Sequence, residues 1–188
     1  MIDLRPIRGD EGAAALAVLD ASFRELWGLD AEQIRARYDP LEDLVDPAAH
    51  YAEHRGAFLV LIDEGHVIGT GGIAALGPET AELTRLGILK AYRGKGLGRR
   101  MVEGLLVFAR WNGYRRVRLE VATPELQEPA VRLYARLGFR SIERYRDGPC
   151  ELSMERDLQG GLLPEARAWL KMCRLSPAGH GAGHWEGR

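Results

Sequence analysis

The sequence predicts an α/β fold in which helices pack on a mixed sheet. Apolar segments with strand character alternate along the chain with segments whose apolar residues recur at helical spacing. One pair of predicted strands is joined by a tight turn, which makes it antiparallel, and a later pair is joined by a helix, which makes it parallel. The chain has 188 residues, 46% of them apolar, so it is long enough to form one domain with a substantial core.

The first part of the chain predicts one strand followed by helices. Residues 2–7 alternate in part and predict the strand. Asp10 is the expected N-cap of a helix that ends near Gly28, because Ala, Leu, Phe and Trp residues recur there at helical spacing. Residues 29–55 are polar and acidic, and they predict short helices or loops, with Pro47 in the first position of a helix opened by Asp46.

The middle of the chain predicts most of the sheet. Residues 57–62 and 67–75 flank a polar turn and predict a hairpin. A central strand is expected to begin near Thr80. Apolar residues on one face predict a helix over 97–112, and the segment 117–121 predicts a strand parallel to the central one.

The last part of the domain predicts a helix over 129–138 and two strands, 139–145 and 150–156. The domain is therefore expected to span residues 1–158. Residues 159–188 are expected to form an appendage, with a short amphipathic helix over 164–174 that packs on the domain or on a second copy of the chain. The Gly-rich residues after this helix are expected to be flexible.

Composition argues against several classes of protein. No apolar run approaches the roughly 20 residues that cross a membrane, and the first residues lack the pattern of a signal peptide. The two cysteines, Cys150 and Cys173, form neither a disulfide framework nor a zinc motif, and a reduced, cytoplasmic setting is expected. His180 and His184 are separated by glycines that disfavour a helical metal site, so no metal is expected.

Charge is divided unevenly along the chain. Residues 1–84 contain sixteen acidic and six basic residues, whereas residues 85–118 contain ten basic residues and one acidic residue. A basic segment around a glycine-rich loop suits a polyanion. Two alternatives are that the arginines cover solvated faces, or that they bind nucleic acid, although no nucleic-acid-binding motif accompanies them.

The glycine-rich loop follows the central strand. Gly94, Gly96 and Gly98 have no Cβ, so a ligand can approach the backbone, and the first amides of the following helix have no helical partner. Such a loop suits phosphate. The dinucleotide fingerprint fails because Arg99 stands at its third glycine, and the P-loop pattern fails because Gly96 follows Lys95.

Two segments instead resemble the GNAT N-acetyltransferase superfamily. Residues 93–98 read Arg-Gly-Lys-Gly-Leu-Gly and match its Arg-x-x-Gly-x-Gly loop for coenzyme A. Residues 130–139 match its second motif, Ala-x-x-Leu-Tyr-x-x-Leu-Gly-Phe. The resemblance covers roughly residues 2–158. It implies a mixed, mostly antiparallel sheet with helices on both faces and splayed central strands, between which the pantetheine arm lies.

The resemblance also implies a reaction, in which acetyl-coenzyme A gives its acyl group to a primary amine by direct attack within a ternary complex. The pyrophosphate would be held by the loop and the first helical turn: Arg93, Gly94, Lys95, Gly96, Leu97, Gly98 and Arg99. Main-chain groups of Leu86 and Ile88 would pair with the pantetheine, and an amide near Ile88 would hold the oxyanion. Gln127 stands where the family often has Asn.

Two side chains are the expected catalytic groups. Tyr134 matches the family's general acid, which protonates the departing thiolate, although a core aromatic on a helix face is the alternative. Glu82 matches the acidic residue that some members use as the base, although an ion pair or a surface position would also explain it.

The expected partner is a small-molecule or peptide amine. The acidic first half favours a cationic acceptor. A coenzyme-A-binding sensor without turnover is the alternative function, and nucleic acid and membranes are disfavoured as partners.

Overall fold

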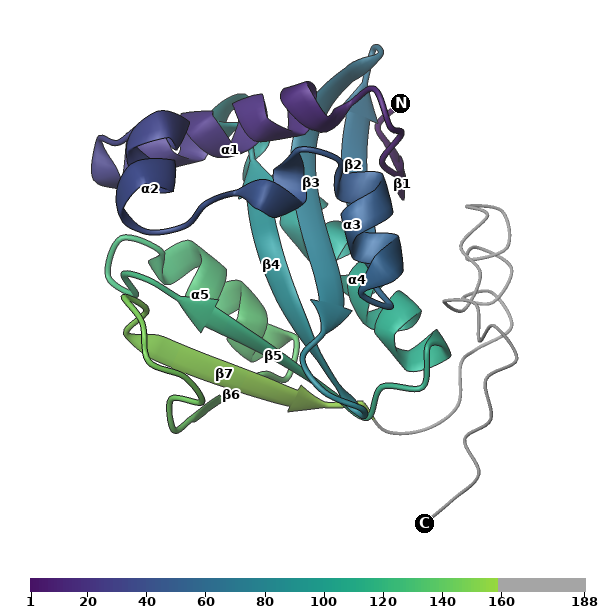
Figure 1. Ribbon diagram of the computed structural model, residues 1–188, viewed down its shortest axis with the longest axis vertical. Helices are drawn as coiled ribbons and strands as arrows, with labels where there is room; N and C mark the ends of the chain where they lie inside the picture. Colours follow the sequence, from purple (N-terminus) through teal and green to yellow (C-terminus); the bar gives the residue numbers. More distant parts are fainter. Residues whose placement is uncertain (159–188) are drawn as a thin grey trace.

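A computed structural model describes residues 1–158, so the predicted appendage, with its helix over 164–174, lies outside the described residues. Its centre is a seven-stranded sheet in the order β1-β2-β3-β4-β5-β7-β6 (Figure 1). The strands are β1 Asp3–Pro6, β2 Ala57–Asp63, β3 His66–Ala75, β4 Thr80–Ile88, β5 Arg116–Val121, β6 Arg140–Ile142 and β7 Leu152–Asp157. Among the strands of residues 1–158, only β4 and β5 pair in parallel, which confirms the predicted mixed, mostly antiparallel sheet.

Helices cover both faces of this sheet, as predicted. They are α1 Gly12–Trp27, α2 Ala31–Arg37, α3 Pro47–Glu53, α4 Leu97–Trp111 and α5 Glu128–Arg136, with short 3₁₀ turns η1 Glu42–Leu44 and η2 Lys90–Tyr92. Two adjacent glycines of β3 show that helices pack on both faces of the sheet. A Cβ on Gly71 would meet Met101 of α4, whereas a Cβ on Gly72 would meet Tyr51 of α3. Successive strand residues point to opposite faces, so α3 and α4 pack on opposite sides.

Strand β2 divides its apolar side chains between two cores. Leu59 and Leu61 pack with α4 and α5, whereas Phe58 and Val60 pack with α1, α2 and α3. A strand that is buried on both faces in this way reads as a continuous apolar run rather than an alternating one. The two cores fix the sheet between its helical layers.

The central strands β4 and β5 diverge. Their parallel ladder consists of three residue pairs, from Thr80 with Arg116 to Glu82 with Arg118. Beyond these pairs the two strands separate toward the end of the molecule that carries α1 and α2 (Figure 1). This is the splay that the resemblance implied, and Glu82 stands where it begins.

A bulge interrupts β4 on its other edge. Thr70 pairs with Gly87 and Gly72 pairs with Thr84, so two β4 residues, Arg85 and Leu86, oppose the single residue Gly71. Arg85 adopts a φ of 55°, in the left-handed region. An extra residue of this kind bends the strand and redirects its side chains.

The helix starts were predicted in part. Asp46 accepts from the Ala49 amide and Pro47 opens α3, as predicted. Asp10 as the N-cap of α1 was wrong, because Glu11 occupies that position and its carboxylate is bonded to Arg5. The start of α1 has no side-chain cap. The ion pair between Glu11 and Arg5 of β1 fixes it instead.

The two C-terminal strands are shorter than predicted. The predicted strand 139–145 is β6, which spans only Arg140–Ile142, and the predicted strand 150–156 is β7, Leu152–Asp157. Residues 143–151 leave the sheet and connect the two strands along the side of the splay.

Candidate active site

A cavity of about 1300 Å³ lies along the splay. Its walls come from α1, α2, β4, β5, α5 and the connection between β6 and β7. Four residues predicted to act at the site line it: Glu82, Leu86, Gln127 and Tyr134. The fold therefore brings the two expected catalytic side chains to one cavity from different elements.

Tyr134 lies on the buried face of α5. Its ring packs edge-on against Phe139, with 5.8 Å between ring centroids, and the residue is 6% exposed. Burial raises the pKa of Tyr134, because the phenolate would lose its hydration there. The hydroxyl therefore keeps its proton at neutral pH, as a proton donor to a leaving group must.

Glu82 is mostly buried at the start of the splay. Its Oε1 accepts a hydrogen bond of 2.7 Å from the Tyr145 hydroxyl and also pairs with the guanidinium of Arg146. Burial and the neighbouring Glu82 raise the pKa of Tyr145, so this hydroxyl remains a donor. The expected base is thus oriented by one partner and neutralised by another.

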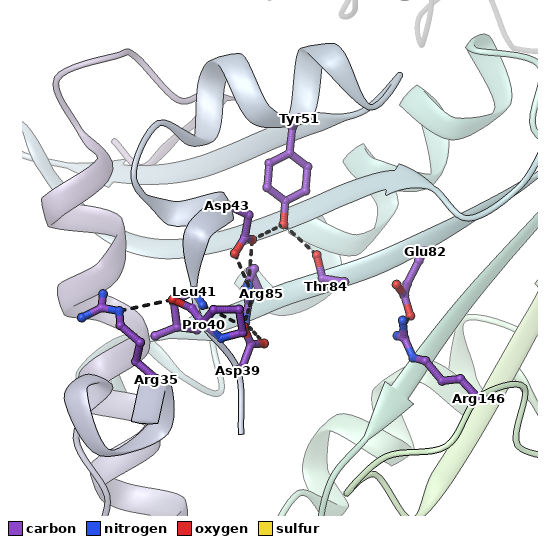
Figure 2. Close-up of polar contacts among 10 residues, drawn as sticks. All are labelled: Arg35, Asp39, Pro40, Leu41, Asp43, Tyr51, Glu82, Thr84, Arg85 and Arg146. Atoms are coloured by element: carbon purple, nitrogen blue, oxygen red, sulfur yellow. Dashed lines mark hydrogen bonds and ion pairs between the residues drawn. The ribbon is translucent and has the colours of Figure 1, made fainter. Parts of the chain in front are cut away.

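Arg146 was not predicted from the sequence as a site residue. It lies in the β6–β7 connection, and its Nε donates to Glu120 Oε2 of β5 at 2.5 Å. Its other end reaches Glu82 (Figure 2). The ion pair between Arg146 and Glu82 joins residues 64 positions apart, so no local pattern in the sequence could have revealed it.

A second ionic cluster forms the opposite wall of the cavity around Arg85. Its guanidinium donates to both oxygens of Asp39, at 2.8 and 3.0 Å, and to both oxygens of Asp43, at 2.8 and 2.7 Å (Figure 2). The Tyr51 hydroxyl lies 2.9 Å from Asp43 and 2.8 Å from the Thr84 hydroxyl. The cluster ties the segment between α2 and α3 to the bulge of β4.

The glycine-rich loop is exposed at the start of α4. Gly94 and Gly96 have φ values of 76° and 77°, and a Cβ on either would meet no atom within 4 Å. Gly98 differs, because its Cβ would approach Leu133 of α5 to 3.2 Å. Two of the glycines therefore shape an open loop, whereas the third allows α5 to pack closely against α4.

The amides that follow this loop suit an anion. Gly96 is the N-cap of α4 and offers no side chain to the first amides, which have no partner within a helix. The Leu97 side chain is buried in the core, so only its main chain faces outward. Arg93, Lys95 and Arg99 are exposed around the loop. This arrangement fits a diphosphate.

The end of β4 offers main-chain groups to the splay. The Leu89 amide donates to the Ile68 carbonyl of β3, and because successive residues alternate, the groups of Ile88 point to the other edge. The Ile88 carbonyl accepts a 2.8 Å bond from Arg93 Nε, and Arg93 also pairs with Glu25. The Arg93 side chain is thus turned toward the strand end and α1.

Gln127 is bonded to the end of β5. Its Oε1 accepts from the Thr123 amide at 3.1 Å, and the Thr123 hydroxyl accepts from Trp27 Nε1 at 3.0 Å. These contacts join α1, β5 and α5 at the open end of the splay. The Trp27 bond is the one of these contacts that crosses from α1 to the segment after β5.

The basic segment 85–118 does not form one surface. Arg85 is paired with two aspartates, Arg115 with Glu79, and Arg118 with Glu155, all outside the glycine-rich loop. The charge count therefore overstated the positive field around the loop.

Within residues 1–158, no group of three or more His, Cys, Asp or Glu side chains is arranged to hold a metal ion. None of the helices described there combines the length and the apolarity that crossing a bilayer requires.

Comparisons with known proteins identify the family of the chain. The sequence pattern of the Acetyltransferase (GNAT) family matches residues 20–139. The chain is 36% identical over 141 residues to YjgM, an uncharacterized N-acetyltransferase of Escherichia coli K12, a match that covers 70% of this chain and 81% of YjgM. It spans only 46–48% of the length of the rat and mouse N-acetyltransferase 8 relatives that it matches.

Solved structures show the same fold. An acetyltransferase of the GNAT family from Staphylococcus aureus Mu50 matches with a TM-score of 0.72 and 18% identity, over 85% of this chain and 100% of that one. PaiA N-acetyltransferase from Thermoplasma acidophilum, solved in complex with coenzyme A, matches with a TM-score of 0.67 and 20% identity, over 84% and 99% of the two chains. The chain belongs to the GNAT acetyltransferase family and is an acetyl-coenzyme-A-dependent acyltransferase.

Proposed function

We propose that this acetyltransferase moves the acetyl group of acetyl-coenzyme A to a primary amine by direct attack in a ternary complex. The observation that carries the proposal is the cavity along the splay, on which Tyr134 and Glu82 converge from α5 and β4. The open glycine loop at the start of α4 supports it, because its amides suit the pyrophosphate.

In this proposal the residues of the chain divide the work. Residues 93–99 hold the pyrophosphate, and the main chain of Leu86 and Ile88 pairs with the pantetheine along the free edge of β4. The bound donor supplies the thioester. Glu82 accepts a proton from the amine, directly or through one water, and the amine nitrogen then bonds to the thioester carbon.

Tyr134 completes the transfer. As the carbon–sulfur bond breaks, its hydroxyl gives a proton to the thiolate and regains one from the amine nitrogen, and the products are the amide and free coenzyme A. Burial keeps Tyr134 protonated until that step. In this proposal the Ile88 amide, on the open edge of β4, stabilises negative charge on the thioester oxygen.

Replacing Tyr134 by Phe tests the proposal. Loss of a general acid should lower kcat by about a hundredfold or more while acetyl-coenzyme A binds as before. The measurements are thiol release with a panel of amines and calorimetry with acetyl-coenzyme A. Tyr114→Phe is the matched control, because that hydroxyl donates to the Arg55 carbonyl away from the cavity.

Two results would contradict the proposal. If calorimetry showed no binding of acetyl-coenzyme A to the folded wild type, the site would be wrong. If Tyr134→Phe kept the full rate with every amine that the wild type acetylates, the role of Tyr134 would be wrong. A coenzyme-A-binding sensor would bind the donor but release thiol with none of the amines.

A further inference from the structure

Arg146 lines the cavity. It bridges two carboxylates that belong to the two diverging strands, Glu82 of β4 and Glu120 of β5. Figure 2 shows the contact with Glu82. All three residues line the cavity. The carboxylate proposed to accept the proton of the amine is therefore already paired with a cation from the chain itself.

The three partners differ in exposure. The side chains of Glu82 and Glu120 are 14% and 11% exposed, whereas that of Arg146 is 45% exposed. Two carboxylates that are mostly withdrawn from water need a cation beside them. Arg146 regains hydration when it turns outward, so it is the partner that a second cation can replace.

Glu82 would stay in place after such an exchange. The Tyr145 hydroxyl donates to Glu82 Oε1 from the same connection that carries Arg146. The Tyr145 ring also lies beside the guanidinium of Arg118, 5.2 Å from the ring centroid, and Arg118 is paired with Glu155 of β7. The Arg146 guanidinium also contacts this ring, 5.3 Å from its centroid, but the Arg118 contact and the bond to Glu82 remain when Arg146 turns outward.

The rest of the cavity favours a positive ligand. Its lining contains three arginines and six carboxylates, namely Asp39, Glu42, Asp43, Glu82, Glu120 and Glu151. Arg85 is already committed to Asp39 and Asp43. A carboxylate on the acceptor would add to an excess of negative charge, whereas a cation would reduce it.

We propose that Arg146 determines acceptor specificity, because its guanidinium occupies the position that a cationic group of the acceptor would take beside Glu82 and Glu120. The inference rests on the proposed function. An amine that carries a further positive charge displaces the guanidinium from Glu82 and Glu120, and an amine that carries a carboxylate does not. Arg146 thus competes with the second positive charge of the acceptor for the two carboxylates.

Equilibrium binding of three probes of equal chain length tests this proposal. They are diaminobutane, aminobutanol and aminobutanoate, which end in a cation, a neutral group and an anion, and their dissociation constants are measured by calorimetry on the full chain. Arg146→Gln should tighten diaminobutane about threefold to fivefold, and Glu120→Gln should weaken it by a similar factor. Aminobutanol should change by less than about twofold in both variants.

Arg144→Gln is the matched control. It removes the same charge from the same connection, but Arg144 donates to the Gly148 carbonyl rather than to the two glutamates. Its binding constants should equal those of the wild type.

Three outcomes would overturn the proposal. Weaker aminobutanoate binding by Arg146→Gln would identify Arg146 as an anchor for anionic acceptors. Equal shifts for all three probes, or the same shifts in Arg144→Gln, would show a structural role. Failure of diaminobutane to bind either the wild type or Arg146→Gln would also overturn it. These binding constants do not depend on turnover, so the thiol-release assay above decides the proposed function separately.

Discussion

Arg85 shows how one side chain can hold a wall of the site. It sits in the bulge of β4 with a φ of 55°, and its guanidinium makes four hydrogen bonds to Asp39 and Asp43. The planar fork of arginine suits two carboxylates in this way, whereas a lysine is a single point of charge. The geometry of the bulge and the position of the segment after α2 therefore depend on one residue.

Replacing Arg85 by Met should destabilise the fold by about 3 kcal/mol, because the mostly buried Asp43 would lose its counter-charge. Arg85→Lys should recover only part of that loss. Urea unfolding at neutral pH measures both. Arg99→Met, which removes an exposed pair with Glu103 on α4, is the control and should leave the transition midpoint unchanged. Equal midpoints for Arg85→Met and the wild type would show that the cluster adds nothing to stability.

The pairings of single residues were the part of the site that the sequence could not predict. Tyr134 and the glycine loop lie in short motifs, so neighbouring residues identify them. Arg85 bonds to partners 42 and 46 positions away and Arg146 to one 64 positions away. Such contacts depend on the relative placement of elements, which local spacing does not encode.

At the scale of elements, β3 is packed tightly between two helical layers. Gly72 leaves room for the ring of Tyr51, whose hydroxyl reaches Asp43 and Thr84 on the same face of the sheet. A Cβ at Gly72 would lie 2.5 Å from that ring, and the two hydrogen bonds prevent the ring from turning aside. The glycine is needed for packing rather than for backbone conformation.

Gly72→Ala should therefore cost about 1–3 kcal/mol of unfolding free energy through overpacking. Gly77→Ala is the matched control, since a Cβ there meets no atom within 4 Å. Thermal and urea unfolding compare the two variants. A Gly72→Ala protein as stable as Gly77→Ala would mean that Tyr51 can shift without cost.

The elements themselves were largely predictable. Periodicity located the hairpin of β2 and β3, the helices α4 and α5, and the parallel strand β5. The prediction failed at β6, where the sequence pattern is weak. No strong breaker precedes the Asp147-Gly148-Pro149 turn, so the strand was expected to continue, but the chain leaves the sheet from residue 143. Their course is set by the bonds of Tyr145 and Arg146 to the splay.

For the molecule as a whole, buried ion pairs link its acidic first half to the sheet. Hydrogen bonds from Arg5 lower the pKa of Glu11. Burial alone would raise the pKa of Asp39, but the bonds and charge of Arg85 outweigh it and lower that pKa. A carboxyl with a lowered pKa stabilises the fold above its unfolded pKa, and this contribution is lost as pH falls through the folded pKa.

The unfolding free energy should therefore be constant from about pH 7 to pH 5 and fall below about pH 4. Asp39→Asn should lower the plateau and flatten the fall, because this carboxyl then binds no proton on unfolding. Urea titrations across this range measure the effect. A variant whose stability falls as steeply as that of the wild type would show that Asp39 does not contribute to acid sensitivity.

Because the ladder between β4 and β5 is short, a molecule bound between these strands should make the sheet more rigid. Three residue pairs, the Arg146 bridge between Glu82 and Glu120, and the bond of Trp27 to Thr123 join the two parts of the sheet. A molecule that pairs with the free edge of β4 adds main-chain hydrogen bonds there that β5 does not provide. Saturation with it should slow hydrogen exchange of the amides from Leu83 to Ile88 and raise the melting temperature with the logarithm of its concentration.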